Sequence, residues 1–423
     1  MSETIENKNL MHNYLTNIGD GAFFGFGVGF ASYTTVIPLF ISTLTSSATL
    51  IGLVPAIHNV GWQLPQLLTA SRISKMERVK PFVMFMTIQE RLPILGLAMV
   101  GMFLPRLSVS AALIISFLLL IWQGLGAGLT ANAWQIMISK VIPSNIRATF
   151  FGFQAAASNL LSSLGAFLSG VILSKISPPF DFATCFLIAT GLYVISWIFL
   201  DQTREQKRSI DPQMMAPTPV FNNMREILKN DRSFRNYLIS RFMTQFGMMS
   251  YAFNIVFAVS KLGMTTVQAG IMTSILLITQ VAANPLLGRL ADKWSRKSVL
   301  ILGCACSAIS SLLAITIIDI NLFSLVFILA GIANACYWTI GFTISLEFGT
   351  EEHRPVYVGM SNTLIAPSTI LAPLLGGLLA DFSGYPTMFI VSAIFAGISI
   401  LILSILVKDP ANHRPEISSS PIN

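Results

Sequence analysis

The chain has 423 residues, of which 53% are hydrophobic and only 11% charged, and its mean hydropathy is +0.70. Because soluble proteins keep roughly a quarter of their residues charged, this composition excludes a water-soluble globular protein. The net charge of +7 does not indicate nucleic-acid binding, since the Lys and Arg residues stand in short turns between apolar runs and not on one face of a soluble fold.

The apolar runs predict an all-α integral membrane protein with twelve transmembrane helices, since a spanning helix needs about 20 mostly apolar residues. The polar N-terminus lacks the short apolar region and cleavage site of a signal peptide, so we expect the first run to be retained. The predicted spans are residues 17–43, 48–71, 81–104, 109–138, 147–174, 182–200, 236–260, 266–288, 298–318, 321–346, 356–380 and 385–407.

The longest polar interruption, residues 201–235, divides the spans six and six. We therefore predict an N-terminal six-helix bundle over 1–200, a central loop over 201–235, a C-terminal six-helix bundle over 236–407 and a tail over 408–423. Within the central loop, apolar residues fall on one helical face and predict a short helix in the membrane plane.

The distribution of Lys and Arg predicts the orientation. The turns after the odd-numbered spans contain only Arg106, Lys175 and Lys261 of the 26 Lys and Arg residues. Cytoplasmic loops carry an excess of these residues. We therefore expect both termini, the central loop and the tail to be cytoplasmic in a multi-pass protein of a cell membrane, either plasma or inner.

An internal repeat relates the two predicted bundles. A shift of 207 positions places Gly152 on Gly359 and Arg147 on Arg354, so that each fifth-type span begins with an arginine. One shared offset across two spans indicates an internal duplication. We expect the two bundles to be pseudo-symmetric.

A basic turn over residues 288–297 joins spans eight and nine. It resembles the Gly-x-x-x-Asp-Arg-x-Gly-Arg-Arg turn of the major facilitator superfamily, which comprises secondary transporters, here of bacterial type. Together with the twelve spans, this resemblance covers essentially the whole chain. The sequence departs from the pattern with a serine at 295 in place of the second glycine. The matching residues are Gly288, Asp292, Lys293 (in place of Arg), Arg296 and Lys297.

The acid in this turn predicts a latch. Asp292 at a helix end can cap the N-terminus of a neighbouring helix and pair with a cation, which would hold the cytoplasmic side shut. Glu347, at the cytoplasmic end of span ten, is a candidate partner for Arg296 or Arg354, and Arg147 is included in the predicted latch. The alternative for Glu347 is a solvated acid at the membrane interface.

The first half departs from the pattern of this turn. Leu68 stands where the second half has glycine, and Arg72 stands where it has aspartate. We expect the latch of the first half to be weaker or differently built. The resemblance also implies an arginine three residues before Gln123-Gly124 in drug–proton antiporters, but Leu120 occupies that position, which argues against their standard mechanism.

Ionisable residues inside spans are costly and indicate function by default. Glu90 and Arg91 in span three and His58 in span two lie at similar depth, and the two spans follow each other through a short turn. We predict an intramembrane polar cluster, formed by His58 with Glu90 or by Glu90 and Arg91 with a third partner. It could couple protons or anions, or it could be a static brace, which the resemblance favours because third helices usually lie outside the cavity.

The resemblance further implies that spans one, four, seven and ten line a central cavity. Of their polar residues, Asn254 and Asn334 are the preferred substrate contacts, and Asp20 lies close to a span end, where an interfacial role is open. Trp134 and Trp338 add aromatic surface. The predicted cavity residues are Asn132, Gln135, Asn254, Asn334 and Tyr337. Interhelical hydrogen bonding is the alternative for the amides.

No enzyme signature is present: the sequence has no phosphate-binding loop and no paired histidines for a metal. Its four cysteines lie inside apolar runs, and we expect no metal and no cofactor. We predict a monomeric secondary transporter that works by alternating access and exports a small amphipathic or hydrophobic solute, with a proton as the coupling ion and the bilayer as its surroundings. The alternatives are uptake of a nutrient, movement of a lipid, or a scaffold or sensor that does not transport.

Overall fold

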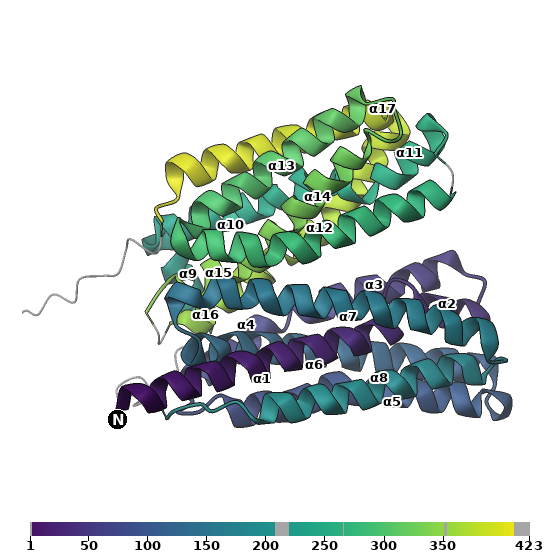
Figure 1. Ribbon diagram of the computed structural model, residues 1–423, viewed down its shortest axis with the longest axis horizontal. Coiled ribbons are helices and arrows are strands. Elements are labelled where there is room, and N and C mark those ends of the chain that lie inside the picture. Colours follow the sequence, from purple (N-terminus) through teal and green to yellow (C-terminus); the bar gives the residue numbers. More distant parts are fainter. Residues whose placement is uncertain (1, 208–219, 265, 351–352, 410–423) are drawn as a thin grey trace, which may run out of the picture.

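The computed structural model describes residues 2–207, 220–264, 266–350 and 353–409, and in these ranges it is built of helices. The helices form two bodies that lie side by side, a first body from residues 2–201 and a second body from residues 232–406 (Figure 1). The predicted tail lies outside the described residues beyond Asp409, and so does part of the predicted central loop.

The first body contains α1 (Ser2–Phe30), α2 (Val36–Leu44), α3 (Ala48–Gln63), α4 (Gln66–Ser74), α5 (Lys80–Phe103), α6 (Val109–Val141), α7 (Arg147–Lys175) and α8 (Phe180–Asp201). Its first two predicted spans are each divided. Residues 31–35 separate α1 from α2, and Leu64 and Pro65 separate α3 from α4. Because Pro65 has no backbone N–H, it cannot continue the hydrogen bonding of α3.

The second body follows a short helix, α9 (Val220–Asn230), and contains α10 (Arg232–Gly247), α11 (Asn254–Leu262), α12 (Thr266–Lys293), α13 (Arg296–Thr316), α14 (Ser324–Ala335), α15 (Gly341–Ser345), α16 (Arg354–Thr363) and α17 (Ala366–Leu401). A π-helical turn, Cys336–Ile340, joins α14 to α15. Gly384 has φ 81°, so α17 bends there and contains parts of the last two predicted spans.

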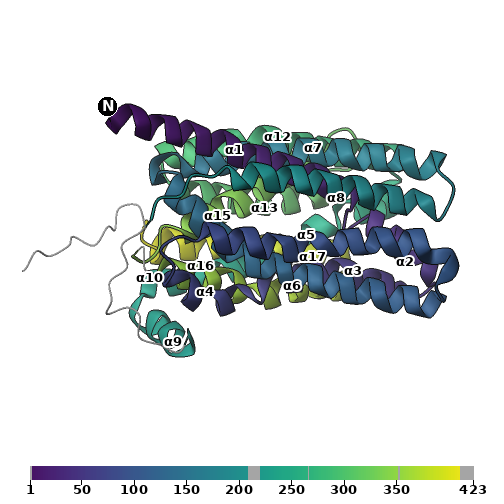
Figure 2. The same cartoon turned by 90° about the horizontal axis from the view of Figure 1, so that it is seen from below.

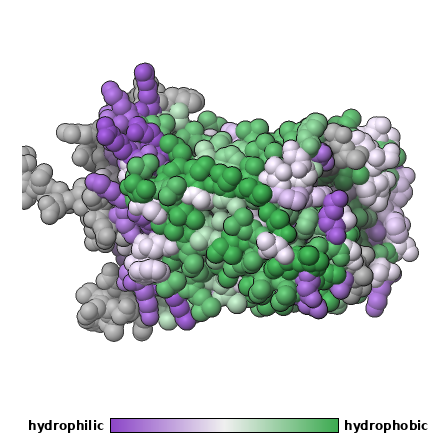
Figure 3. All heavy atoms as spheres, turned by 90° about the horizontal axis from the view of Figure 1, so that it is seen from above, coloured by the Kyte–Doolittle hydropathy of each residue, from purple (hydrophilic) through white to green (hydrophobic). Residues whose placement is uncertain are grey.

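Nine helical segments of the described chain are long and apolar enough to cross a membrane. One of them, Arg354–Leu406, is 53 residues long and holds two passes because of the bend in α17. The divided first two spans are not among the nine, because each of their helices is too short or too polar. Figure 3 shows a hydrophobic belt with hydrophilic side chains gathered at the ends. The predicted all-helical membrane fold is thus confirmed.

One end of the molecule holds the start of α1 together with α4, α9, α15 and α16, and we call it the N-terminal end (Figures 1 and 2). Near this end α7 of the first body packs closely on α12 of the second. A methyl group on Gly152 would meet the backbone of Asn284 and Pro285, and one on Gly288 would meet the backbone of Ala148. Glycine thus allows the two helices to approach at backbone distance and closes this end.

Candidate functional site

The end of α12 carries an acid that joins the two bodies. The Asp292 carboxylate accepts hydrogen bonds from the backbone N–H groups of Ala148 (3.1 Å) and Thr149 (2.6 Å), in the first turn of α7. These N–H groups have no partner within their own helix, and the helix dipole makes this turn favourable for an anion. Asp292 therefore caps a helix of the opposite body.

Four charged residues continue this contact. Arg296 lies 2.8 Å from Asp292 and 3.2 Å from Glu347, and Arg147 of α7 lies 2.6 Å from the same Glu347 oxygen. Arg296 also donates to the carbonyl of Ser144 in the first body. We call these four residues the ionic latch. Since all four side chains are at least 85% buried, the latch is only weakly screened by salt.

The remaining residues of the predicted latch take other positions. Lys297 donates to the carbonyl of Val407 (2.6 Å) within its own body, and Lys293 is exposed. Gly288 lies against the first turn of α7, and Arg354 begins α16. The sequence left Arg296 and Arg354 as alternative partners of Glu347, and the structure pairs it with Arg296 and Arg147.

On the other side of the bundle, the two bodies meet through neutral groups where α4 faces α16. The side chain of Asn132 donates to the carbonyls of Gln66 and Pro355, both at 3.0 Å, and that of Asn362 donates to Gln66 Oε1 at 2.7 Å. The hydroxyl of Thr363 donates to the carbonyl of Gln63, the last residue of α3. We call these six residues the amide contact.

The first-half counterpart of Asp292 takes no part in the amide contact. Arg72 is exposed, and its guanidinium lies 5.6 Å from the centre of the Phe82 ring in its own body. The two contacts between the bodies are therefore unlike: charged where α12 meets α7, and neutral where α4 meets α16.

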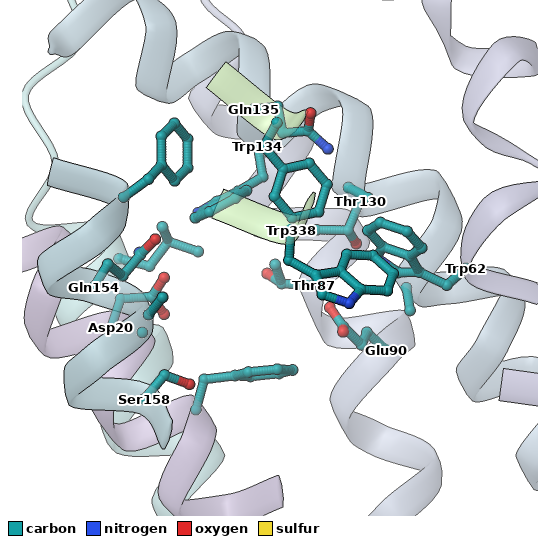
Figure 4. A pocket seen from close by; sticks show the side chains of 18 of the residues that line it. Asp20, Trp62, Thr87, Glu90, Thr130, Trp134, Gln135, Gln154, Ser158 and Trp338 are labelled. Atoms are coloured by element: carbon teal, nitrogen blue, oxygen red, sulfur yellow. The ribbon is translucent and has the colours of Figure 1, made fainter. Parts of the chain in front are cut away.

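Between these contacts lies a cavity of about 290 Å³. Most of its wall comes from the first body, from α1, α5, α6 and α7, and Trp338, Thr339 and Phe342 of the second body complete it. Its aromatic residues are Phe24, Trp62, Trp134, Phe151, Trp338 and Phe342. Figure 4 shows the rings of Trp62 and Trp338 next to each other, near Glu90.

The charged residues of the cavity wall are Asp20, Glu90 and Arg91. Arg91 Nη2 lies 3.2 Å from Asp20 Oδ1, and the hydroxyl of Ser196 donates to the same oxygen at 2.5 Å. The Asp20 and Arg91 side chains are 7% and 10% exposed, so this is a buried ion pair. Glu90, by contrast, has no hydrogen bond or ion pair with any residue that the structure describes.

The predicted contact between His58 and Glu90 is not formed. The His58 ring stacks on Tyr33 with ring centres 3.7 Å apart, and its Nδ1 lies 3.0 Å from Gln123 Oε1. The ring therefore faces α6 and the start of the loop after α1 and does not line the cavity. The third partner of the alternative arrangement is Asp20, which pairs with Arg91.

Of the five predicted cavity residues, Gln135 lines the cavity. Asn132 belongs to the amide contact instead. Asn254 is buried at the start of α11, Asn334 is half-buried on α14, and Tyr337 packs beside Arg241. Tyr337 lies in the π-helical turn next to Trp338, but its side chain projects toward Arg241. Trp338 and Thr339 face the cavity from the same turn.

The sequence interpretation missed several residues of this wall. It placed the third helix outside the cavity, whereas Thr87, Glu90 and Arg91 of α5 line it. Trp62 and Phe342 carried no signal, because an aromatic residue in an apolar run is ordinary. Asp20 could have been identified from the sequence, because an acid inside a span needs a cation at similar depth and Arg91 is such a cation.

Metal binding is not indicated by the residues that the structure describes. Among them, no three His, Cys, Asp or Glu side chains are grouped to hold a metal ion.

Comparisons with known proteins agree with the fold. The sequence matches the family model described as Major Facilitator Superfamily over residues 21–257 and 237–421. Multidrug resistance protein 3 of Bacillus subtilis (strain 168) is 24% identical over 145 residues, 34% of this chain and 28% of that protein. Tetracycline resistance protein, class H, of Pasteurella multocida is 32% identical over 137 residues, 32% of this chain and 34% of that protein. These matches span about a third of each relative.

A solved structure matches over its whole length. The Major Facilitator Superfamily transporter FucP in the outward conformation has a TM-score of 0.77, with 95% of this chain and 100% of that chain covered. At 12% identity this likeness shows the fold alone. Since the family model matches nearly the whole sequence and the fold agrees with it, the chain belongs to the Major Facilitator Superfamily of membrane transporters and is not an enzyme.

Proposed function

We propose that this protein is a secondary transporter that exports small amphipathic or hydrophobic solutes in exchange for protons, with the cavity between the two bodies as its binding site. The observation that carries the proposal is the cavity itself, with six aromatic residues and a single carboxyl group, Glu90, that has no partner among the described residues. An apolar wall with few polar groups suits an apolar ligand.

The contacts between the bodies support alternating access. The ionic latch lies on the N-terminal side of the cavity residues of α7, the amide contact lies beside the cavity residues of α6, and both contacts join one body to the other. A transporter of this kind moves one half against the other around a central site. The latch would hold one state closed at the N-terminal end and would break in the other state.

The distribution of charge supports the orientation. Arg147 and Arg296 belong to the ionic latch, and the basic turns that follow the even-numbered spans lie at the same end as the start of α1 (Figures 1 and 2). By the excess of positive charge on cytoplasmic loops, we infer that both termini face the cytoplasm and that the ionic latch is the cytoplasmic gate. The site would then face outward in the conformation described here.

The coupling role falls to Glu90. A carboxyl inside a membrane span without a cation partner can gain and lose a proton, whereas Asp20 is held by Arg91 and Ser196. His58, the other candidate from the sequence, lies outside the cavity wall. Export is favoured over uptake by the names of the two relatives, which are resistance proteins against several drugs and against tetracycline.

The proposal is tested by dye accumulation in a bacterial strain that lacks its main drug exporters. Cells expressing the protein should accumulate less Nile red, an uncharged amphipathic dye, than cells with an empty vector. A protonophore should remove the difference, because it collapses the proton gradient. Higher accumulation than in the vector control would instead favour uptake. An unchanged level across a panel of apolar dyes and nutrients would favour the scaffold.

A further inference from the structure

We propose that the cavity selects organic solutes that carry one positive charge on an apolar body. This inference rests on the proposed function, since it names the charge of the substrate that the same cavity would take. The charges of the wall are the first observation. Arg91 forms a buried ion pair with Asp20, and Glu90 remains as a carboxyl without an ion pair or hydrogen bond among the described residues.

An ionised carboxyl in this position needs a cation. Removing a charge from water costs several kcal/mol unless a partner compensates it. Glu90 has neither a hydrogen bond nor an ion pair among the described residues. Arg91, the next residue in the chain, forms its ion pair with Asp20 instead. A proton can neutralise Glu90, and so can the positive charge of a ligand. Both cannot be bound to it at once, which is the property that an exchanger requires.

The aromatic rings around Glu90 fit the same ligand. Trp62 and Trp338 come from opposite bodies, with ring centres 6.0 Å apart and planes at 65°, and Phe342 lies 5.8 Å from Trp62. In Figure 4 both indoles lie on the side of the cavity where Glu90 projects. Aromatic faces attract a cation within about 6 Å, Trp most strongly, and they also pack against the apolar body.

A buried acceptor adds to this preference. Gln135 is 1% exposed, it lines the cavity, and its Oε1 has no hydrogen-bond partner among the described residues. A carbonyl oxygen accepts hydrogen bonds, so a protonated amine could donate to it. The wall thus offers one charged and one neutral acceptor.

The opposite assignment, an anionic substrate, has one argument. Arg91 Nε and Nη1 are buried without a hydrogen-bond partner. The same guanidinium, however, is bound to Asp20 and lies 5.7 Å from the centre of the Phe24 ring. An anion that reached it would meet two carboxylates, Asp20 and Glu90, in the same cavity. Since like charges at short range in a poorly solvated site repel strongly, the cation is favoured.

The test uses two ions of nearly the same shape and opposite charge, tetraphenylphosphonium and tetraphenylborate. The full chain is placed in lipid nanodiscs, each ion is titrated separately by equilibrium dialysis, and empty nanodiscs give the partitioning blank. We expect the wild type to bind tetraphenylphosphonium at least about tenfold more tightly than tetraphenylborate, a difference typical of one charged contact. Glu90→Gln should reduce tetraphenylphosphonium affinity by about the same factor.

Glu226→Gln is the matched control, because it makes the same change on the exposed face of α9, outside the cavity wall. It should leave both affinities unchanged. Equal binding of the two ions by the wild type, tighter binding of tetraphenylborate, or binding of neither would each overturn the inference. The wild-type comparison decides even if Glu90→Gln fails to fold, which its elution profile would reveal.

Failure of this inference and failure of the proposed function can be told apart. Export of uncharged Nile red without preference for tetraphenylphosphonium would overturn the charge selectivity and leave the exporter intact. Selective binding of tetraphenylphosphonium without proton-dependent export of any dye would support the selectivity and overturn the exporter.

Discussion

Arg147 Nη1 of the first body lies 2.6 Å from Glu347 Oε1 of the second, so a single carboxylate oxygen joins the two halves of the protein. The same oxygen is 3.2 Å from Arg296 Nη1. Two guanidinium groups therefore share the Glu347 carboxylate at the N-terminal end, and Arg296 also pairs with Asp292. Opening of this end must separate Arg147 from Glu347, together with the hydrogen bonds that Asp292 and Arg296 make to the first body.

Glu347→Gln should favour the state in which the N-terminal end is open. The substitution leaves two buried arginines with one fewer acid, and breaking a buried charge pair across an interface costs roughly 2 to 5 kcal/mol. We expect a cysteine placed at Ala131 in the cavity wall to be labelled faster from the N-terminal side by an impermeant maleimide. The four buried native cysteines would first be replaced.

Glu77→Gln is the control for this experiment, because Glu77 pairs with Lys207 at the same end but at 3.8 Å and with 61% of its side chain exposed. An exposed pair contributes little, so the labelling rate should stay at that of the parent. Equal rates in both variants would mean that Glu347 does not hold the end closed.

Asp292→Asn should impair transport far more than Arg72→Gln. Asparagine keeps one acceptor for the N–H groups of Ala148 and Thr149 but loses the charge and the second acceptor. Hydrogen bonds to charged groups contribute about 1.5–3 kcal/mol, so we expect about a tenfold lower transport rate. Arg72 is exposed over Phe82, a contact of about 0.5–1 kcal/mol, and its replacement should change the rate by about twofold or less.

The measurement is the initial rate of dye export from cells with matched amounts of protein in the membrane. Equal losses in Asp292→Asn and Arg72→Gln would show that both positions serve only to orient the chain during insertion, as basic turns do. A larger loss in Arg72→Gln would contradict the asymmetry of the two contacts.

The sequence allowed the spans and the ionic latch to be anticipated, because both are local patterns. A span is one uninterrupted apolar run, and Asp292 and Arg296 stand four positions apart in the sequence. The breaks before Val36 and at Pro65 were missed, since the residues on either side are apolar and the run continues through them. A pattern of hydropathy reports burial in lipid and does not report where a helix bends.

The cavity was less accessible to prediction, because its residues come from helices far apart in the chain. Asp20 and Arg91 are 71 positions apart and meet only because α1 and α5 both contribute to the cavity wall. His58 and Glu90 have similar depth but project toward different neighbours, a property that depends on helix rotation. Depth can be counted from a span end, whereas rotation about the helix axis is set by packing.

Glu90→Gln should uncouple export from the proton gradient, whereas His58→Gln should not. Glutamine has the shape of the protonated acid and cannot exchange a proton, so the pH gradient can no longer drive the cycle. His58 lies against Tyr33 and Gln123, outside the cavity wall, and its replacement should leave the dependence on pH unchanged. Proteoliposomes with an imposed pH gradient and Nile red as substrate provide the measurement.

The decisive quantity is the ratio of transport with and without the gradient. We expect this ratio to fall to about one in Glu90→Gln, as it must when no proton is carried, and to stay at the wild-type value in His58→Gln. A gradient-dependent Glu90→Gln would exclude coupling at this position and return the carboxyl to the role of a brace. Loss of gradient dependence in His58→Gln would place the proton path along α3 instead.

Gly29→Ala should destabilise the first body by about 1–3 kcal/mol, the usual cost of an added group in a tightly packed contact. A methyl group on Gly29 would lie 2.8 Å from the backbone N of Ala166 and would also meet the carbonyl of Ser162, both on α7. Backbone atoms cannot turn aside as a flexible side chain can, so α1 and α7 would have to separate.

Gly170→Ala on α7 is the control, because nothing lies within 4 Å of its added methyl and alanine favours the helix. Unfolding of purified protein in one detergent at one heating rate should give a lower midpoint for Gly29→Ala and an equal or higher midpoint for Gly170→Ala. Equal midpoints for both variants and the wild type would mean that α1 and α7 are free to move apart, and the close approach would then contribute nothing to stability.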